Sequence, residues 1–361
     1  MSEQKHTKKV ILGISGGVDS AVCAYLLKQQ GYNVIAVFMQ NWDQANDDHC
    51  TANEDLKDAL LVCQQLQIPF ETINFAKEYW RNVFESFLTS HKQGLTPNPD
   101  ILCNSEIKFK KFLEYAMSKN ADYIATGHYA KIIKKDDLYL LAQPKDYAKD
   151  QTYFLHLLEQ YQLQKALFPL ADYTKPEVRA IAAKINLANR SKKDSTGICF
   201  IGERKYNDFL SEFMLSRKGD IITEHGEKVA THNGLMFYTL GQRKGINLGG
   251  IKEKKEQPWY VLAKDLKNNT LIIGQGKDNP KLYNSCANMA AIHWIAEKPG
   301  MPFKCMVKIR YNQALQECEV TEYKEQFKVQ FSSKQRAVTP GQSAVFYLNG
   351  ICYGGGVIVS S

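Results

Sequence analysis

The first 130 residues alternate short apolar runs with stretches of helical spacing, and this alternation constrains the fold more than any other feature. The apolar runs predict four strands, at 9–14, 33–39, 70–75 and 122–126. The other stretches predict four helices, at 21–30, 54–67, 78–89 and 106–117. Strands that alternate with helices of this length indicate an α/β fold with a doubly wound parallel sheet. Such sheets bind ligands beyond the carboxyl ends of their strands.

The pattern changes at about residue 215, where short strand-like stretches replace the helices. The next predicted strands lie at 220–223, 234–240, 258–264 and 270–276. Turn pairs such as Asn233–Gly234 and Asn268–Asn269 separate them, and further strands follow from about residue 285. We therefore predict three domains, an α/β domain at 1–214, a β-rich central domain at 215–282 and a C-terminal β-barrel at 283–361.

Composition places the 361-residue chain among ordinary globular proteins, with 44% hydrophobic and 23% charged residues. No apolar run approaches the roughly 20 residues that a membrane-spanning helix needs. The first ten residues also lack the apolar stretch of a signal peptide. We therefore expect a cytoplasmic protein that does not associate with membranes. The formal net charge of +8 permits a polyanionic partner without requiring one.

The nine cysteines are odd in number, and no two of them show C-x-x-C spacing. This pattern argues against a disulfide scaffold and against a structural zinc site. Free cysteines usually behave as small buried apolar residues, so a chemical role needs support from the surrounding sequence.

A glycine-rich string, Ser15-Gly16-Gly17-Val18-Asp19-Ser20, connects the first predicted strand to the first predicted helix. Two glycines let the backbone approach a phosphate closely, and the N–H groups of the following helix point at the anion. Ser15 and Ser20 add hydroxyl donors, and Asp19 is a candidate Mg²⁺ ligand. The string therefore predicts a phosphate-binding turn.

Other interpretations of this turn fit less well. The Walker A motif requires Gly-Lys followed by Ser or Thr, which occurs nowhere in the chain. Residues 13–17 match the G-x-S-x-G pattern of a hydrolase nucleophile elbow, but that elbow belongs in mid-sheet with an acid and a histidine downstream. A glycine-rich turn without a ligand is the remaining alternative.

The same string resembles the pyrophosphate loop of the PP-loop ATP pyrophosphatases, which have an adenine nucleotide alpha hydrolase-like fold. Members of that superfamily cleave ATP to AMP and pyrophosphate by adenylating an oxygen of a second substrate. Alone, the resemblance leaves amide ligases open. It implies ATP and Mg²⁺, with the nucleotide bound by Gly13, Ile14, Ser15, Gly16, Gly17, Val18, Asp19 and Ser20.

Two strings that contain cysteines narrow the range of PP-loop enzymes that the chain can resemble. The first string, Asn98-Pro99-Asp100-Ile101-Leu102-Cys103-Asn104, precedes the helix predicted at 106–117. The second string, D-S-T-G-I-C-F-I-G at 194–202, contains Cys199, which lies 96 residues after Cys103 (199 − 103). Together with T-G-H-Y at 126–129 and K-D-Q-T-Y-F at 149–154, these strings resemble the bacterial tRNA-specific 2-thiouridylase family over essentially the whole chain. That resemblance implies an ATP-dependent sulfurtransferase that 2-thiolates the wobble uridine of tRNA.

The resemblance also implies roles for individual residues. Cys199 would carry a persulfide and Cys103 would be the second, nucleophilic thiol, with a transient Cys103–Cys199 disulfide between them. The target base would contact Asn98, Pro99 and Asp100, of which Asp100 is also a candidate acid or base. Met39 and Gly127 would contact the nucleotide, although Met39 alone would be assigned to the core. The implied tRNA contacts are His128, Lys149, Asp150, Gln151, Arg310, Tyr311 and Gln342.

These residue types suit the reaction. ATP activates uracil O2 by adenylation, a persulfide provides sulfur, and a second thiol releases that sulfur to leave a disulfide that a reductant reopens. Such exchange proceeds through thiolates and depends on thiol pKa and access. Cys103 lies near the start of the helix predicted at 106–117, where the positive end of the helix dipole favours a thiolate.

Basic residues gather in two segments. Residues 184–205 hold six basic and two acidic side chains, and residues 243–256 hold five basic and two acidic ones. A solvated charged face is the alternative explanation, but one cluster brackets Cys199, which favours phosphate contacts with RNA. Unstacked bases of the anticodon stem-loop could then be recognised by aromatic stacking.

Two rival functions remain open from the sequence. A PP-loop amide ligase explains the turn but not the paired cysteine strings, and a non-catalytic RNA-binding protein leaves Asp19 and both thiols unexplained. The lack of grouped cysteines argues against an iron–sulfur cluster or zinc. No sulfur-donor domain is evident, so we expect a separate persulfide-donor protein as a partner alongside tRNA. The chain itself is expected to be a monomer.

Overall fold

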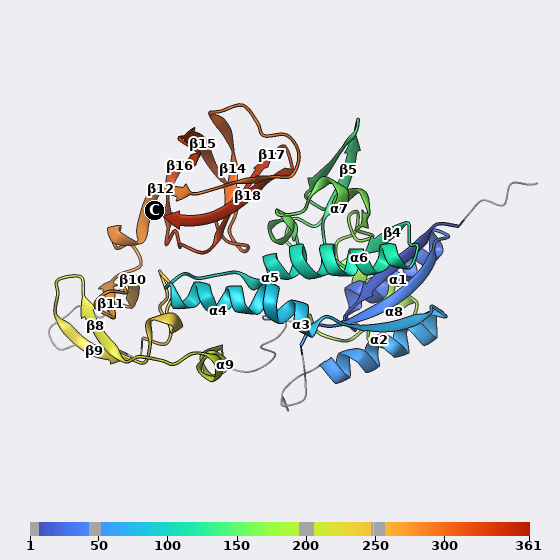
Figure 1. Ribbon diagram of the computed structural model, residues 1–361, viewed down its shortest axis with the longest axis horizontal. Coiled ribbons are helices and arrows are strands. Elements are labelled where there is room, and N and C mark those ends of the chain that lie inside the picture. The colour runs from blue at the N-terminus through green and yellow to red at the C-terminus, as the bar shows by residue number, and fades with distance from the viewer. Residues whose placement is uncertain (1–6, 43–51, 195–205, 247, 249–256) are drawn as a thin grey trace, which may run out of the picture.

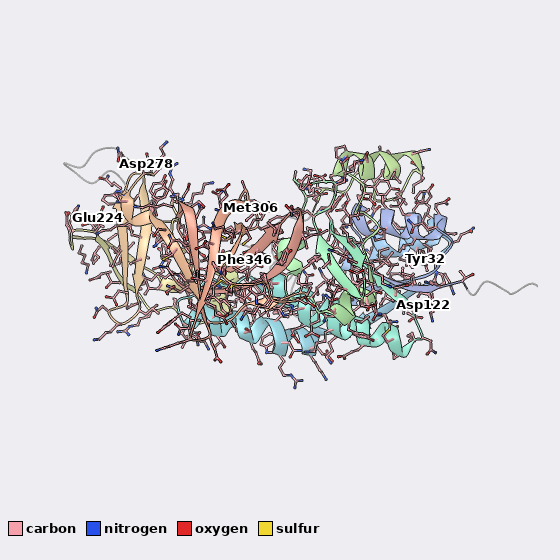
Figure 2. The ribbon with its side chains drawn as sticks, turned by 90° about the horizontal axis from the view of Figure 1, so that it is seen from above. Tyr32, Asp122, Glu224, Asp278, Met306 and Phe346 are labelled. Carbon is pink, nitrogen blue, oxygen red and sulfur yellow. The ribbon has the colours of Figure 1, made fainter. Side chains whose placement is uncertain are left out.

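The protein is elongated, with the N-terminal parallel sheet at one end, a smaller β-sheet at the other end and a β-barrel between them (Figure 1). From above, Tyr32 and Asp122 mark one end, Glu224 and Asp278 mark the other, and Phe346 of the barrel lies between (Figure 2). The computed structural model describes residues 7–42, 52–194, 206–246, 248 and 257–361. No helix in these ranges is long and apolar enough to cross a membrane.

The N-terminal part is built on a five-stranded sheet in the order β3-β2-β1-β4-β7. Its strands are β1 (Lys9–Ile14), β2 (Asn33–Gln40), β3 (Phe70–Asn74), β4 (Tyr123–Ala125) and β7 (Ala166–Leu167). Every neighbouring pair is parallel. The predicted parallel sheet is confirmed, and β1 has the predicted bounds.

Side chains that alternate along the strands pack into two separate cores, one on each face of the sheet. Val10, Leu12 and Ile14 of β1 belong to the first core, and Ile11 belongs to the second. The first core is covered by α1 (Val18–Gln29), α2 (Ala52–Leu66) and α8 (Lys175–Lys184). The second core is covered by α3 (Ala76–Tyr79), η1 (Trp80–Phe84), α4 (Glu85–Lys92), η2 (Cys103–Lys111) and α6 (Phe112–Ser118). Helices on both faces make the sheet doubly wound.

The helix predicted at 106–117 begins too late, because α5 (Pro99–Leu102) leads directly into η2 and α6. Asn98 caps this longer helix, and its Oδ1 accepts the N–H of Asp100 at 3.1 Å. Pro99 takes the first helical position, where its missing N–H costs no hydrogen bond. The cap and the proline, rather than the apolar spacing, therefore set where the helix begins.

The central sheet has four strands in the order β10-β11-β8-β9 and follows α9 (Tyr206–Phe213). Its strands are β8 (Gly219–Thr223), β9 (Lys228–His232), β10 (Trp259–Asp265) and β11 (Thr270–Gln275). The strand predicted at 234–240 is wrong, because a 3₁₀ turn, η4 (Leu235–Phe237), occupies that stretch. Leu235 and Tyr238 are buried in the core of this sheet, which explains an apolar run that is not a strand.

The C-terminal strands form a closed barrel in the order β12-β16-β15-β14-β17-β18, and β18 pairs back with β12. Its strands are β12 (Tyr283–Met289), β14 (Phe303–Lys308), β15 (Gln316–Tyr323), β16 (Gln326–Arg336), β17 (Ser343–Leu348) and β18 (Ile351–Ser360). The predicted C-terminal barrel is confirmed. The remaining short elements are η3 (Thr152–Leu155), α7 (Gln160–Gln164), η5 (Pro280–Leu282) and β13 (His293–Trp294).

A hairpin from the first half of the chain extends the sheet of the barrel. It consists of β5 (Lys131–Lys135) and β6 (Leu138–Ala142), and β6 pairs antiparallel with β18 through Ala142 opposite Ile351 and Leu141 opposite Cys352. The barrel sheet therefore includes residues that the sequence assigned to the N-terminal domain.

A buried ion pair joins the barrel to the α/β part. The Asp150 side chain has no exposed surface, and Lys308 Nζ on β14 lies 3.3 Å from its Oδ2. Asp150 also accepts hydrogen bonds from Gln143 Nε2 at 2.7 Å and from Thr152 Oγ1 at 2.6 Å. Removing one member of such a pair leaves an uncompensated buried charge, so the contact between the barrel and the sheet domain is costly to break at this point.

We predict that Lys308→Met destabilises the protein by about 3–5 kcal/mol, because it leaves the Asp150 carboxylate buried without its cation. Urea denaturation followed by intrinsic fluorescence measures the change. Lys304→Met is the matched control, since Lys304 lies on the same strand and is exposed. The control should shift stability by no more than about 0.5 kcal/mol. Equal unfolding midpoints for Lys308→Met and wild type would contradict the prediction.

Candidate active site

The turn between β1 and α1 approaches a neighbouring helix through backbone alone. Gly16 has a φ of +75°, and a Cβ at this position would lie 2.3 Å from the carbonyl oxygen of Asp55 on α2. Only glycine fits there. Gly17 is the N-cap of α1, and no side chain caps that helix start. The first N–H groups of α1 therefore suit an anionic ligand such as a phosphate.

The two serines of the turn play different parts. The buried Ser20 Oγ accepts the N–H of Ser15 at 3.2 Å and donates to the carbonyl oxygen of Gly17 at 3.1 Å. Ser20 therefore shapes the turn from inside. Ser15 is exposed, so its hydroxyl is the one accessible to a ligand.

Predicted nucleotide contacts from three strands surround the turn. A Cβ on Gly13 would lie 2.9 Å from Met39 Cε, and a Cβ on Gly127 would lie 3.0 Å from the backbone nitrogen of Ser20. The ends of β1, β2 and β4 thus meet at the turn, as the carboxyl edge of a parallel sheet requires. Met39 is half-buried and also packs against the second core.

A chain of ion pairs starts at Asp19 on the first turn of α1. Lys175 Nζ lies 2.6 Å from Asp19 Oδ1 and 2.7 Å from Asp194 Oδ1. Tyr129 Oη donates to Asp19 Oδ1 at 3.1 Å. One ammonium group therefore links the phosphate-binding turn to the first residue of the string that carries Cys199.

Asp194 collects two further cations. Lys149 Nζ lies 2.9 Å from Asp194 Oδ2, and Arg179 Nη2 lies 2.7 Å from Asp194 Oδ1. Burial alone raises the pKa of Asp194, but the hydrogen bonds and charges of Lys175 and Lys149 outweigh it and hold the pKa well below its usual range. Asp194 is therefore a permanent anion, and Lys149 is engaged with it.

Three residues of this site escaped the sequence analysis: Lys175, Arg179 and Asn189. Lys175 and Arg179 lie on α8, whose start is marked by a capping box between Thr174 and Glu177 that a closer inspection of the sequence could have found. Asn189 Nδ2 donates to the carbonyl oxygen of Gly16 at 2.8 Å. No local pattern signals that last contact, because tertiary packing creates it.

The predicted nucleophile Cys103 lies inside the protein, with 3% of its surface exposed, and belongs to the second core. Because the helix begins at Pro99, Cys103 lies in its second turn. Our expectation of a thiol near the helix start is therefore corrected, and the dipole argument, which holds for the first turn, does not apply. The next residue, Asn104, donates from Nδ2 to the carbonyl oxygen of Phe154 at 3.2 Å.

Asp100 lies on the first turn of the same helix, beside the predicted base contacts Asn98 and Pro99. Burial raises the pKa of the Asp100 carboxyl, and the charge of Lys108 partly opposes that rise. A carboxyl with a raised pKa suits a group that donates or accepts a proton. Its role as acid, base or base contact stays a prediction.

The predicted tRNA contacts in the α/β part differ in accessibility. His128 is 9% exposed, and its Nδ1 lies 2.8 Å from Thr126 Oγ1. Burial lowers the pKa of His128 well below its usual value, and the charge of Lys108 acts in the same direction, so the imidazole is neutral. Gln151 Oε1 accepts the N–H of Tyr129 at 2.9 Å. Among these residues, Lys149 presents an accessible cation.

The predicted tRNA contacts on the barrel approach the same region. The Tyr311 ring lies 4.5 Å from that of Phe154, centroid to centroid. Arg310 donates to the carbonyl oxygens of Arg336 and Ala337. Gln342 Nε2 donates to the carbonyl oxygen of Thr96 at 2.7 Å, so it contacts the loop that leads into Asn98.

Several predicted residues lie outside the described part of the chain. Cys199 is among them, and with it the predicted Cys103–Cys199 disulfide. Within the first basic cluster, Lys192 Nζ lies 2.6 Å from Asp55 Oδ1 and also pairs with Asp58 of α2, so the protein itself engages this lysine. Lys193 is exposed. The other cluster members outside the described residues are Arg204, Lys205, Lys252, Lys254 and Lys255.

A metal site was predicted at Asp19. Across the ranges that the structure describes, no three His, Cys, Asp or Glu side chains gather as a metal-binding group. Mg²⁺ commonly uses one or two carboxylates together with substrate phosphates. Asp19, on the helix that follows the phosphate-binding turn, provides one such carboxylate.

Comparison with models of protein families shows which class of protein the chain belongs to. Residues 8–203 match the family model described as the tRNA methyl transferase HUP domain. Residues 207–275 match the tRNA methyl transferase PRC-barrel domain, and residues 284–358 match the aminomethyltransferase beta-barrel domain. With its parallel sheet and phosphate-binding turn, the chain is an ATP-dependent HUP-domain enzyme.

Curated relatives then define the family. The chain is 54% identical to the tRNA-specific 2-thiouridylase MnmA of Proteus mirabilis, over 97% of each chain. It is 52% identical to the tRNA-specific 2-thiouridylase MnmA of Francisella tularensis subsp. novicida, over 98% of this chain and 99% of that relative. The chain belongs to the tRNA-specific 2-thiouridylase family. The resemblance inferred from the sequence is confirmed.

We predict that Gly16→Ala lowers the rate of pyrophosphate release from ATP by about 100-fold. A Cβ at this position would collide with the Asp55 backbone and displace the turn, and a shift of about 1 Å in such a site costs about 100-fold in rate. Gly31→Ala is the matched control, because Gly31 also has a positive φ, of +82°, but has no atom within 4 Å of its Cβ position. Equal pyrophosphate release by both variants would show that the close approach at Gly16 is not required.

Proposed function

We propose that the chain 2-thiolates the wobble uridine of tRNA in two half-reactions, adenylation of uracil O2 by ATP and transfer of a persulfide sulfur from Cys199, with Cys103 as the second thiol. As a member of its family, the chain thiolates uridine in tRNA. The ion-pair chain from Asp19 through Lys175 to Asp194 carries the two-step proposal. It joins the phosphate-binding turn to a residue five positions before Cys199 (199 − 194).

The first half-reaction uses the turn between β1 and α1. The N–H groups at the start of α1 and the Ser15 hydroxyl supply donors for the phosphates of ATP, and Lys175 supplies a cation beside them. Asp19 would hold Mg²⁺, which neutralises the charge of the departing pyrophosphate. Attack of uracil O2 on the α-phosphorus breaks the bond to pyrophosphate and makes AMP the leaving group at C2.

The second half-reaction replaces the activated oxygen with sulfur. The terminal sulfur of the Cys199 persulfide attacks C2, and the C2–oxygen bond breaks as AMP leaves. The Cys103 thiolate then attacks the Cys199 sulfur, which cleaves the sulfur–sulfur bond and leaves the terminal sulfur on C2. The products are 2-thiouridine, AMP and a Cys103–Cys199 disulfide. A thiol reductant must reduce that disulfide before the next cycle.

The predicted contacts provide a plausible surface for the anticodon stem-loop. Asn98, Pro99 and Asp100 lie on the helix that carries Cys103, which suits contacts with the target base. The paired rings of Tyr311 and Phe154 suit stacking with an unpaired base, as in single-stranded RNA recognition. Lys149 supplies a cation for a phosphate. A separate persulfide-donor protein, a monomeric state and a cytoplasmic location complete the proposal.

We predict that a sulfur donor adds one sulfur atom to the peptide that contains Cys199, and that Cys199→Ser loses this label. Cys103→Ser should accept the persulfide but leave tRNA unthiolated, because the sulfur–sulfur bond to Cys199 cannot then be cleaved. Peptide mass spectrometry and nucleoside analysis measure the two outcomes. Cys286→Ser, at a half-buried cysteine of the barrel, is the control and should behave as wild type.

One turnover without reductant should leave a disulfide between Cys103 and Cys199, which needs their Cα atoms within about 7 Å. Persulfide found on Cys103 and never on Cys199 would overturn the assignment of the two thiols, even if tRNA thiolation itself occurred.

A further inference from the structure

The segment of residues 189–194, called here the anchor segment, is fastened to the phosphate-binding turn at three points. Asn189 Nδ2 donates to the carbonyl oxygen of Gly16 at 2.8 Å. Lys192 pairs at 2.6 Å with Asp55, the residue whose backbone packs against Gly16. Asp194 reaches Asp19 through the shared ammonium of Lys175. The chain that continues into the Cys199 string therefore starts from a fixed place beside the nucleotide site.

Asp194 is the last of these three contact points along the chain, and it contacts the most cations. Its two carboxylate oxygens contact three cations, which are Lys175 and Arg179 of α8 and Lys149. Arg179 further fixes the segment by donating to the carbonyl oxygen of Arg190 at 3.2 Å. Only 12% of the Lys175 side chain is exposed, so solvent screens its two ion pairs less than it screens a surface pair.

Two of the three cations also lie where the substrates are expected. A triphosphate on the turn beside Asp19 would compete for the Lys175 ammonium, because phosphate oxygens form strong charge-assisted hydrogen bonds. An RNA phosphate would compete in the same way for Lys149, whose side chain is 41% exposed. Arg179, by contrast, is held by the backbone of the anchor segment itself. Binding of either substrate would therefore change the pairing of Asp194.

The position of Asp194 also limits where sulfur can be delivered. Five residues of extended chain span at most about 18 Å, so the place of Asp194 bounds the reach of Cys199. A carboxylate that is fixed beside the nucleotide and paired with substrate-facing cations is well placed to coordinate adenylation with sulfur transfer.

We propose that Asp194 is a positioning residue for sulfur transfer, whose ion pairs with Lys175 and Lys149 couple sulfur delivery by Cys199 to the binding of ATP and tRNA. The proposal rests on the proposed function, because it takes Cys199 as the sulfur carrier. It assigns no contact with a reacting atom to Asp194.

The test variant is Asp194→Asn, which keeps the shape of the side chain and removes its charge. Single-turnover thiolation by the persulfide-loaded enzyme should fall about tenfold or more, as expected for a misplaced reacting group. Pyrophosphate release on the same tRNA should survive, so the loss falls on the second half-reaction. Arg179→Gln removes a different partner of Asp194, away from the turn, and should reproduce the defect. Asp194→Glu, which restores the carboxylate, should recover most of the rate.

A second readout does not depend on activity. The rate at which iodoacetamide alkylates Cys199, followed by peptide mass spectrometry, should change in wild type when a non-hydrolysable ATP analogue is added. Asp194→Asn should lose this response. Glu114→Gln, which removes the Lys111–Glu114 ion pair at the start of α6, is the control and should keep this response.

An unchanged nucleotide response in Asp194→Asn, together with wild-type thiolation, would overturn the proposal. A failure of the proposed function looks different, because wild type itself would then release no pyrophosphate with tRNA or carry no persulfide on Cys199.

Discussion

The central place of β1 in the parallel sheet is the constraint on which the site depends. β1 pairs with β2 on one side and with β4 on the other, so its carboxyl end lies between two neighbouring strand ends. The phosphate-binding turn leaves β1 at that point, and Gly127 follows β4 closely enough to touch Ser20. Backbone hydrogen bonds of the sheet therefore position the residues that we propose bind the nucleotide, and the side chains of the turn need only refine the geometry of that site.

Charge then connects this edge of the sheet to the rest of the molecule. Lys175 on α8 bridges Asp19 and Asp194, and Lys149 continues the connection toward the stretch that includes Asp150. Asp150 is in turn paired with Lys308 of the barrel. Two sets of ion pairs thus join parts of the chain that are distant in sequence, and the sets meet at the neighbouring residues Lys149 and Asp150.

The fold of the parallel sheet and the turn between β1 and α1 could be predicted from the sequence, because both depend on residues that are close together in the chain. Alternating apolar runs predicted the bounds of β1, and Ser15–Ser20 marked the turn between β1 and α1 that we propose binds phosphate. Other features depend on contacts between distant residues, such as Asn189 with Gly16, and no spacing rule finds these. Local signals also misled in two places. The apolar stretch around Leu235 is buried without being a strand, and the helix of Cys103 begins at its cap rather than at its first apolar residue.

The β5–β6 hairpin has a consequence for synthesis of the chain. Ala142 of β6 pairs with Ile351 of β18. The ribosome must therefore add 209 further residues (351 − 142) after Ala142 before β6 can pair with β18. At the usual 5–20 residues per second, a ribosome needs about 10–40 s for that length. During this time a nascent chain exposes an unpaired strand edge that other strands could join. The lysines at 131, 134 and 135 on β5 place charge on the opposite edge, which discourages such association. The late arrival of β18 thus makes completion of the barrel sheet one of the last steps in synthesis, long after β7, the last strand of the parallel sheet, has been made.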